Sequence, residues 1–522
     1  MNRPILRAGD WIRLSAERFP DRRAIVFHDG SARTYAEINS RVNRLASALT
    51  RHGVAKGDRV AILALDGGGY LETILATMKL GAVYVPINYK LAPNEVHTLV
   101  ARAEAKVILI DDRYAETAMG LKGAIDGLGL VVSFDGSSAD IAYEDLLATG
   151  DDVEPDVAVD DSDIIGLAFT SGTTGLPKGV LQSQGMLKAM IAARQVQYDV
   201  RDDDFRYGAS PMFHIAGQVM LLSHLTRGIP SLVLPKFDTD TVVRWLGSGE
   251  ITSCFMVPTM ISSVLAHPQV AEGDYSNLRT IIYGSAPMTP TLLRRAIERF
   301  GCDFINSFGA GTEAGLQAML DQADHRAAIA GKEHLLGSIG KPATGVDLRI
   351  VDDDGNDVPT GVVGNIVTRS DSVMSGYLEM PEETAAAFRD GWFWGGDLAY
   401  RDEEGYLYLS GRSKDMIIRG GENIYPVEIE TVLSAHPAVR ECAVVGKPDE
   451  HWGEVVVAFV RTVDDADISA DELRAHCRAS LAPHKVPVDY RRLDEMPTNP
   501  SGKILKTSLR VLLAEHDLVA QA

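Results

Sequence analysis

The stretch from Thr170 to Gly179 carries the residue types of a phosphate-binding loop. Glycines let the backbone approach an anion closely, and hydroxyl groups and backbone amides supply hydrogen-bond donors. A single lysine adds a mobile positive charge. This combination is the chemistry of a triphosphate-binding turn. The candidate phosphate ligands are Thr170, Ser171, Gly172, Thr173, Thr174 and Lys178.

This loop differs from a Walker A loop, whose pattern G-x-x-x-x-G-K-[ST] opens a helix. Here Pro177 precedes the lysine and Gly179 follows it. Apolar residues flank the loop at 164–169 and 180–181, which indicates a strand on each side. We therefore expect a strand–loop–strand turn to hold the phosphates. The alternative is a Ser/Thr/Gly-rich surface turn, which the order of residues and the Pro-Lys-Gly ending disfavour.

The elements around this loop predict a large α/β protein. A capping box at Thr34–Glu37 opens an amphipathic helix, and short apolar strands alternate with helices from there to residue 110 and again over 186–308. Such alternation predicts doubly wound, largely parallel sheets. Residues 337–409 are rich in short strands and glycine turns and predict a β-rich subdomain. A compact α+β pattern follows Gly411. We expect a domain over 1–411, a hinge at 412–416 and a small mobile domain over 417–522.

Composition narrows the class of protein. The chain has 522 residues, 45% hydrophobic and 24% charged, as in ordinary soluble proteins of more than one domain. The net charge of -21 argues against general binding to nucleic acid or to an anionic membrane. No signal peptide or apolar run of about 18 residues is visible, so we expect a cytoplasmic protein without a membrane-spanning segment. The scattered cysteines indicate a reduced protein without a zinc site or disulfide framework, at Cys254, Cys302, Cys442 and Cys477.

Further motifs occur in a fixed order behind the phosphate loop. Together with that loop they resemble the adenylate-forming superfamily, which comprises acyl-CoA synthetases, luciferases and peptide-synthetase adenylation domains. The resemblance runs from about Thr34 to Arg510. Two positions depart from the family pattern, Gln184 where histidine is common and Asn365 where glutamate is common. The motifs are Pro211–His214, Tyr283–Pro287, Asn306–Glu313, Gly396–Asp397, Gly411–Asn423 and Pro497–Lys503.

The resemblance implies a set of nucleotide contacts. Phe308 would stack on adenine, Thr312 would meet the α-phosphate, and Glu313 with Thr170 would hold Mg²⁺, which accepts hard oxygen ligands. Asp397 has two acceptor oxygens for the ribose hydroxyls. One extra residue separates Phe308 from Thr312, so either the loop bulges or another residue stacks on adenine. The remaining implied ATP and AMP contacts are Ser285, Ala286, Pro287, Asn306, Ser307, Gly309 and Arg412.

The resemblance also assigns residues to the second half of a reaction. His214 would lie between the acyl pocket and the thiol channel, although by itself it could be a structural histidine. Lys414 would be the hinge, and Gly420 and Gly421 would lie along the pantetheine arm of CoA. Lys503 would be the catalytic lysine, where an isolated lysine would ordinarily be a solvated surface residue. With Glu313, Thr312 and His214, it completes the predicted catalytic set.

These motifs predict an acid–CoA ligase, an AMP-forming acyl-CoA synthetase. The enzyme would use Mg²⁺ and ATP to convert a carboxylic acid to acyl-AMP and pyrophosphate, and CoA would then displace AMP. One alternative is a stand-alone adenylation enzyme that loads a carrier protein, and another is a nucleotide-binding protein without catalysis. The candidate pocket stretches contain no Lys or Arg, so we expect an apolar monocarboxylic acid, with a fatty acid slightly favoured over an aryl acid. The sequence is compatible with a homodimer and does not fix the oligomeric state.

Overall fold

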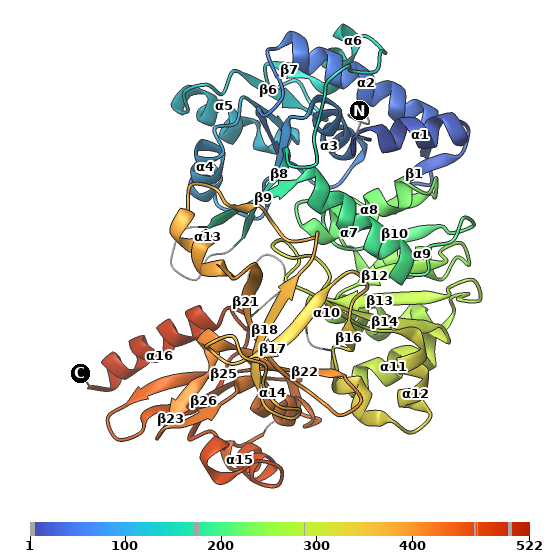
Figure 1. The fold of residues 1–522 in the computed structure, drawn as a ribbon. Coiled ribbons are helices and arrows are strands. Elements are labelled where there is room, and N and C mark those ends of the chain that lie inside the picture. The colour runs from blue at the N-terminus through green and yellow to red at the C-terminus, as the bar shows by residue number, and fades with distance from the viewer. Residues whose placement is uncertain are drawn as a thin grey trace.

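The first of two large sheets contains β8 and β9, the two strands that flank the phosphate loop in sequence (Figure 1). The computed structural model describes residues 6–170, 177–286, 288–463, 466, 468–498 and 504–521. Within them, the sheet has the strand order β19-β9-β8-β4-β3-β5-β6-β7, parallel from β8 to β7 and antiparallel at β8–β9 and β9–β19. Its strands are β3 (Arg59–Leu63), β4 (Val83–Pro86), β5 (Val107–Ile110), β6 (Leu130–Ser133), β7 (Ile141–Ala142), β8 (Ile164–Thr170), β9 (Lys178–Ser183) and β19 (Gly376–Tyr377).

Helices cover this sheet because its strands are apolar on both faces. The predicted capping box starts α2: the Thr34 hydroxyl accepts the Glu37 N–H at 3.2 Å, and the Glu37 carboxylate accepts the Thr34 N–H at 2.7 Å. Both orphan donors at the helix start are thereby paired. The helices of this part are α1 (Asp10–Arg18), α2 (Tyr35–Arg51), α3 (Gly68–Leu80), α4 (Pro93–Arg102), α5 (Ala115–Ala124) and α6 (Tyr143–Thr149).

The second sheet follows the order β16-β15-β14-β13-β12-β10-β11-β1-β2 in the described residues. It is parallel from β14 to β1 and antiparallel at both edges. Its strands are β1 (Arg23–Phe27), β2 (Ala32–Thr34), β10 (Arg206–Gly208), β11 (Ser231–Val233), β12 (Ser253–Met256), β13 (Thr280–Gly284), β14 (Asp303–Phe308), β15 (Ala318–Leu320) and β16 (Lys341–Pro342). Its helices are α7 (Gln184–Gln197), α8 (Ile215–Leu225), α9 (Thr239–Leu246), α10 (Pro258–Ala266), α11 (Pro290–Phe300) and α12 (Gln322–Ile329).

A small antiparallel sheet confirms the predicted β-rich subdomain. Its β21 and β22 pair along their length, and β22 ends at Arg412, where the C-terminal part begins. Short 3₁₀ helices connect elements here and elsewhere, among them η4 (Ser413–Asp415) directly after β22. The elements of the subdomain are β17 (Asp347–Val351), β18 (Gly364–Arg369), α13 (Pro381–Ala387), β20 (Phe388–Arg389), β21 (Trp392–Arg401) and β22 (Leu407–Arg412).

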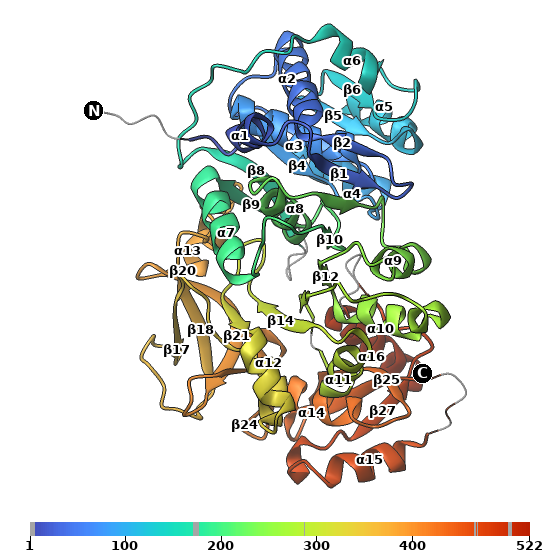
Figure 2. The same ribbon diagram turned by 90° about the vertical axis from the view of Figure 1, so that its right-hand side faces the viewer.

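The C-terminal part has its own sheet and its own apolar cores. It lies at the end of the molecule opposite to α1–α6 in both views (Figure 1 and Figure 2). The predicted fold class is confirmed: α/β with a β-rich subdomain and a smaller α+β C-terminal part. No helix in the described part of the chain is long and apolar enough to cross a membrane. The C-terminal elements are β23 (Ile417–Arg419), β24 (Glu422–Ile424), α14 (Pro426–Ser434), β25 (Val439–Asp449), β26 (Gly453–Thr462), α15 (Ala470–Arg478), β27 (Asp489–Arg492) and α16 (Lys506–Gln521).

Candidate active site

The phosphate loop joins two strands of a hairpin, as the sequence predicts. Strands β8 and β9 are antiparallel, and their last pair is Thr170 with Lys178. The Lys178 ammonium lies 4.7 Å from the centre of the Tyr377 ring, on the neighbouring strand β19. This cation–π contact fixes the lysine side chain at the first residue of β9. Four predicted phosphate ligands lie outside the described residues, namely Ser171, Gly172, Thr173 and Thr174.

Glu313 lies beside this hairpin although 143 residues separate it from Thr170 in sequence. The Thr170 hydroxyl donates a weak hydrogen bond to a carboxylate oxygen of Glu313, at 3.4 Å. Burial raises the pKa of the Glu313 carboxyl to about 7, against the opposing charges of Arg412 and Lys178. The predicted Mg²⁺ ligands Glu313 and Thr170 are therefore neighbours, and two cations face the same carboxylate.

The extra residue in the predicted adenine motif is accommodated by a tight turn. Gly311 has a φ of +44°, which favours glycine, and pairs with Gly315 across the turn. The Glu313 N–H donates to the Ala310 carbonyl at 3.0 Å, and the Glu313 carbonyl accepts the Met374 N–H at 2.7 Å. The turn thereby fixes the backbone on either side of the Glu313 side chain. Thr312 lies in the same turn, half-buried.

Phe308 is occupied by contacts within the protein. Its ring is half-buried and packs against the apolar cluster that β15 shares with the β-rich subdomain, which includes Ile339, Leu348 and Leu407. The ring therefore has a structural role in this cluster. Whether it also stacks on adenine stays a prediction.

The strand that ends at Phe308 is closely tied to its neighbours. The Ser307 hydroxyl lies 2.6 Å from the Tyr198 hydroxyl. Gly284 pairs with Ser307 on the other side, and a side-chain carbon at Gly284 would lie only 2.2 Å from the Ser307 carbonyl. Ser285 follows with a φ of +66°, unusual for a residue other than glycine. The turn at Ser285 and Ala286 thus lies next to the end of β14. Asn306 and Gly309 flank Ser307 and Phe308 there in sequence. Pro287 lies outside the described residues.

Asp397 and Arg412, two of the predicted nucleotide ligands, form an ion pair with each other. The Arg412 Nε lies 2.9 Å from a carboxylate oxygen of Asp397, and the two residues are direct partners of β21 and β22. The positive charge of Arg412 also opposes the raised pKa of Glu313. The structure therefore brings together Thr170, Lys178, Glu313, Asp397 and Arg412, which the sequence distributes over 243 positions.

The C-terminal candidates lie on loops beyond Arg412. Lys414 is exposed in η4, and its neighbour Asp415 forms a 2.9 Å ion pair with Arg510 of α16. Gly420 and Gly421 make the two-residue turn between β23 and β24, with φ values of +60° and +88°. A turn with both central residues at positive φ favours glycine at each position. These glycines thus have a structural reason besides their predicted contact with CoA.

Lys503 lies outside the described residues, as do its neighbours from 499 to 502. Thr498 and Ile504 form a bridge across this stretch, and the Leu505 N–H donates to the Pro497 carbonyl at 2.7 Å. The ends of the loop that carries the predicted catalytic lysine are therefore held together. Its catalytic role stays a prediction.

His214 lies at the start of α8, away from the ion pairs. Burial, and then the nearby charge of Lys90, lower the pKa of His214 to about 4, so the ring is neutral at physiological pH. Its Nε2 is buried and has no hydrogen-bond partner in the described part of the protein. A side-chain carbon at Gly311 would lie 3.8 Å from Ile215, so the Glu313 turn approaches the first residue of α8. His214 is therefore next in sequence to Ile215, which lies near the Glu313 turn.

Tyr377 was missed by the sequence reasoning. Its ring contacts Lys178, and burial followed by the charge of Glu313 raises the pKa of its hydroxyl. Nothing near Tyr377 in the sequence marks it, because its place depends on the pairing of β19 with β9, almost 200 residues earlier. Only a prediction of that long-range strand pair could have found it.

Comparison with known proteins gives matches along nearly the whole chain. A model described as AMP-binding enzyme matches residues 12–378, and one described as AMP-binding enzyme C-terminal domain matches residues 428–503. Feruloyl-CoA synthase of Amycolatopsis sp is 39% identical over 96% of this chain and 98% of its own length. Indoleacetate–CoA ligase of Aromatoleum aromaticum is 35% identical over 99% of this chain and 100% of its own.

A solved structure has the same overall fold. ATP-bound MatB from Rhodopseudomonas palustris superposes with a TM-score of 0.89 at 29% identity, covering 97% of this chain and 99% of MatB. The first family match spans more than half of the residues and includes the phosphate loop and the motifs up to Glu313, and the C-terminal match includes Pro497–Lys503. The chain therefore belongs to the family of AMP-binding enzymes, the adenylate-forming superfamily that its motifs resemble.

Proposed function

We propose that this protein is an acid–CoA ligase that joins a carboxylic acid to CoA with the conversion of ATP to AMP and pyrophosphate. The enzyme class is confirmed by the family match and by the CoA ligases among its relatives. The observation that carries the residue-level proposal is the convergence of a hairpin lysine, a buried carboxylate and an arginine–aspartate pair, Lys178, Glu313, Arg412 and Asp397.

In the first half-reaction a carboxylate oxygen of the acid attacks the α-phosphorus of ATP and pyrophosphate leaves. Negative charge then builds on the phosphoryl oxygens, and preorganised donors that meet this charge lower the barrier. Lys178 and the loop before it would bind the β- and γ-phosphates. Thr312 and Lys503 would face the α-phosphate, while Asp397 and Arg412 would bind the ribose. The adenine would lie along Ser285–Pro287 and Asn306–Gly309.

Magnesium fits the donor set near the hairpin. Glu313 supplies a carboxylate oxygen and Thr170 a hydroxyl oxygen, both hard ligands, and they lie 3.4 Å apart. Among the residues that the structure describes, no group of three or more His, Cys, Asp or Glu side chains could form a metal site. Mg²⁺ is commonly held by one or two carboxylates together with substrate phosphates, so a single carboxylate and a hydroxyl are a sufficient protein contribution. The ion would neutralise phosphate charge; Glu313 and Thr170 would hold it.

In the second half-reaction the CoA sulfur attacks the acyl carbon and AMP leaves. Gly420 and Gly421 would lie along the pantetheine arm, and His214 would border the channel. His214 is neutral at physiological pH, so it would border the channel as an uncharged ring. Lys414 would allow the C-terminal part to change orientation between the two half-reactions.

The acid is proposed to be an apolar monocarboxylic acid. Two of the relatives have names that specify acids with an aromatic ring, ferulate and indoleacetate, at 39% and 35% identity. A long-chain-fatty-acid–CoA ligase of Mycobacterium tuberculosis is 36% identical, so both the aryl and the fatty alternative stay open, and the feruloyl-CoA synthase, at 39%, gives the aryl acid a slight preference. The acid pocket would be formed by residues 214–218, 255–260 and 283–287, in which the chain has no Lys or Arg.

The proposal is tested by incubating the purified protein with Mg²⁺, ATP, CoA and a panel of aryl, fatty and dicarboxylic acids. The expected result is equal formation of AMP and acyl-CoA, with the highest kcat/KM on an aryl monocarboxylic acid. Pyrophosphate release without transfer to CoA would favour a carrier protein as acceptor. No acid-dependent pyrophosphate release with any acid would favour a non-catalytic nucleotide-binding protein.

A further inference from the structure

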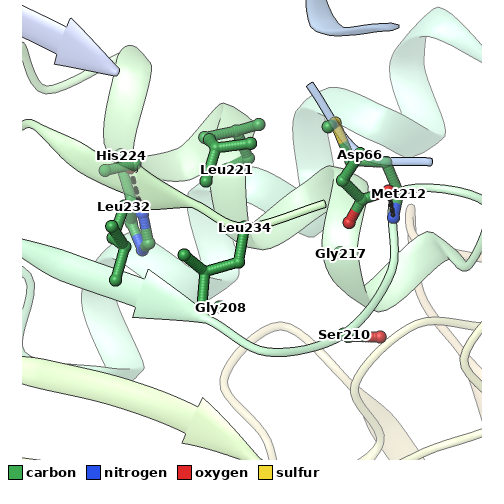
Figure 3. A pocket seen from close by; sticks show the side chains of 11 residues that line it. Asp66, Gly208, Ser210, Met212, Gly217, Leu221, His224, Leu232 and Leu234 are labelled. Atoms are coloured by element: carbon green, nitrogen blue, oxygen red, sulfur yellow. Dashed lines mark hydrogen bonds between the residues drawn. The ribbon is translucent and has the colours of Figure 1, made fainter. Parts of the chain in front are cut away.

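The side chains of Asp66, which is half-buried, and Gln218, which is buried, hold both backbone groups of Met212, two residues before His214. The Met212 N–H donates to a carboxylate oxygen of Asp66 at 2.9 Å. The Met212 carbonyl accepts a hydrogen bond from the Gln218 side-chain amide at 2.8 Å. Asp66 comes from the loop between β3 and α3, and Gln218 comes from α8. Figure 3 shows Asp66 and Met212 facing each other beside a small cavity.

The segment between Met212 and His214 has little freedom to absorb a shift. The His214 N–H donates to the Pro211 carbonyl at 3.0 Å. Gly217 packs so closely that a side-chain carbon there would lie 2.4 Å from the carbonyls of Ser210 and Pro211. The Asp66 N–H donates to the Pro235 carbonyl at 3.2 Å, which ties the Asp66 backbone to the segment after β11. A displacement of Met212 is therefore passed to His214.

The His214 ring depends on this backbone for its place. Its Nε2 has no partner in the described residues, so no hydrogen bond at that atom orients the ring. The ring packs on Phe213 at 4.3 Å between centres, and Phe213 packs edge-on against Tyr89 at 5.3 Å. Packing and the Met212 peptide thus determine where the imidazole lies.

We propose that Asp66 and Gln218 are positioning residues that set the place of the His214 side chain through the backbone of Met212. The inference rests on the proposed function, in which His214 borders the channel between acid and thiol. It assigns these polar residues a part in the second half-reaction. Asp66 lies outside the proposed pocket stretches, and Gln218, which lies within one of them, uses its side-chain amide to hold Met212.

The carboxyl of Asp66 makes this positioning sensitive to pH. Burial raises its pKa to about 8, the Met212 N–H lowers it, and the charge of Asp111 raises it further. The other titratable groups that face it are Tyr70, Tyr89 and Tyr207, and the neutral His224 lines the opposite side of the cavity. No cation is among these groups. An ionised carboxylate is the stronger acceptor for the Met212 N–H, so the positioning tightens as the pH rises through about 8.

A small cavity lies beside the Asp66 carboxyl, so this carboxyl can gain or lose its proton inside the protein. It has a volume of about 20 Å³, enough for one water molecule, and its polar lining includes Asp66, Ser210, Ser231 and His224. His224 bonds Ser231 at 2.8 Å, on the side away from Met212 (Figure 3). The pair formed by His224 and Ser231 is therefore separate from the contact between Asp66 and Met212.

The experiment measures thioester formation from supplied acyl-adenylate in Asp66→Ala, Gln218→Met and His214→Ala, alone and in pairs. A misplaced group in an active site can lower the rate by about tenfold or more, so each single variant should lose roughly that much. Asp66→Ala combined with His214→Ala should be no slower than His214→Ala alone. Full additivity of the two losses would overturn the proposal, because Asp66 would then act without His214.

Two conservative variants keep the test independent of folding defects. In Asp66→Asn the amide oxygen can still accept the Met212 N–H, so thioester formation at pH 7 should stay within about twofold of wild type. The rise in rate near pH 8 should disappear. Asp111→Asn is the matched control: its carboxylate accepts the Leu65 N–H at 2.9 Å instead of a bond from the His214 segment, so the rise should persist at a slightly lower pH. An unchanged pH profile in Asp66→Asn would contradict the inference.

Amide hydrogen exchange of Met212 separates this inference from the proposed function. The Met212 amide should exchange faster in Asp66→Ala than in wild type, and Asp66→Asn should restore its protection. This result can be obtained even from a protein that makes no thioester. Equal exchange in all three proteins would show that Asp66 does not hold the segment.

Discussion

Individual residues at the site are explained by the charges and packing around them. Glu313 lies among cations and next to the Thr170 hydroxyl, as expected for a carboxylate that shares its surroundings with phosphates. His214 lies in an apolar environment and stays neutral. The two residues therefore suit the two half-reactions, one dominated by charge and the other by access of a thiol.

Lys503→Ala should abolish most of the first half-reaction and spare the second. Removing one preorganised donor to a developing oxyanion costs about 3–4 kcal/mol, or roughly 10²–10³ in rate. Pyrophosphate release should fall by that factor, while thioester formation from supplied acyl-adenylate continues. The matched control is Lys506→Ala, because Lys506 instead forms a 2.7 Å ion pair with Glu430. Equal losses in both half-reactions of a folded Lys503→Ala protein would refute the assignment.

His214→Phe should change the dependence of stability on pH. The pKa of His214 is lowered in the folded protein, so its neutral form is favoured there, and its contribution to stability is lost as the pH falls from about 6.5 toward 4. Between these values the wild type should lose up to about 1.4 kcal/mol more per pH unit than His214→Phe. Denaturant unfolding at several pH values measures this difference. Parallel pH profiles for the two proteins would mean that folding does not lower the pKa of His214.

At the scale of elements, the predicted hinge lies where β22 ends and η4 begins. Lys414 is exposed there. Among the ion pairs that the structure describes for η4, Asp415 forms the one that joins this stretch to the C-terminal part, through Arg510. In the proposed function, adenylation would need Lys503 at the α-phosphate, whereas thioester formation would need the turn at Gly420 and Gly421 near the channel. One orientation of the C-terminal part is not expected to serve both.

Lys414→Pro should therefore separate the two half-reactions. Proline fixes φ near -65° and restricts the residue before it, so the hinge would be held in one orientation. Adenylation should persist and thioester formation should fall at least tenfold, while Lys414→Ala should change either step by less than about threefold, since it leaves φ and ψ free. Separate assays of the two half-reactions measure this. Equal effects of proline and alanine would point to the charge of the lysine instead of the backbone.

The sequence predicted the elements that local patterns specify. The capping box at Thr34, the hairpin around the phosphate loop and the β-rich subdomain all follow from residue periodicity and turn residues within short windows. It also predicted Glu313, Asp397 and Arg412, because their motifs occur in a recognisable order. These three are neighbours in the structure, as the predicted nucleotide site requires.

Contacts between distant segments were beyond the sequence. Tyr377 joins the site because β19 pairs with β9, and Asp66 meets Met212 across 146 residues. Single polar residues such as Asp66, in a glycine-rich loop, and Gln218, in an apolar helix, carry no periodic signal. The packing of Phe308 against the apolar cluster of the β-rich subdomain could not be predicted either, because that cluster forms only when the second large sheet packs against the sheet of the subdomain.

At the scale of the whole molecule, the site is built where separate folding units meet. The hairpin and β19 belong to the first sheet, the Glu313 turn follows β14 of the second, and Asp397 and Arg412 belong to the β-rich subdomain. The C-terminal part begins at the next residue. Nucleotide binding would therefore link all four units, and a shift of the C-terminal part would act directly on the site.

This arrangement predicts that nucleotide stabilises the protein as a whole. A ligand that binds only the folded state adds about 2.7 kcal/mol at a hundred times its Kd. AMP or ATP should therefore raise Tm by several degrees, and Asp397→Asn should reduce the rise. Thermal unfolding with and without nucleotide measures it, with urea denaturation as a second probe. An equal rise of Tm in Asp397→Asn would mean that Asp397 does not bind the nucleotide.

The central claim is that the protein transfers an activated acyl group to CoA. The most direct measurement follows AMP, pyrophosphate and acyl-CoA together, with an aryl acid, ATP, Mg²⁺ and CoA present, and then with each omitted in turn. The account predicts that all three products form in equal amounts and that acyl-CoA disappears when any component is left out. Formation of AMP and pyrophosphate at an unchanged rate with no acyl-CoA, across aryl and fatty acids alike, would contradict it.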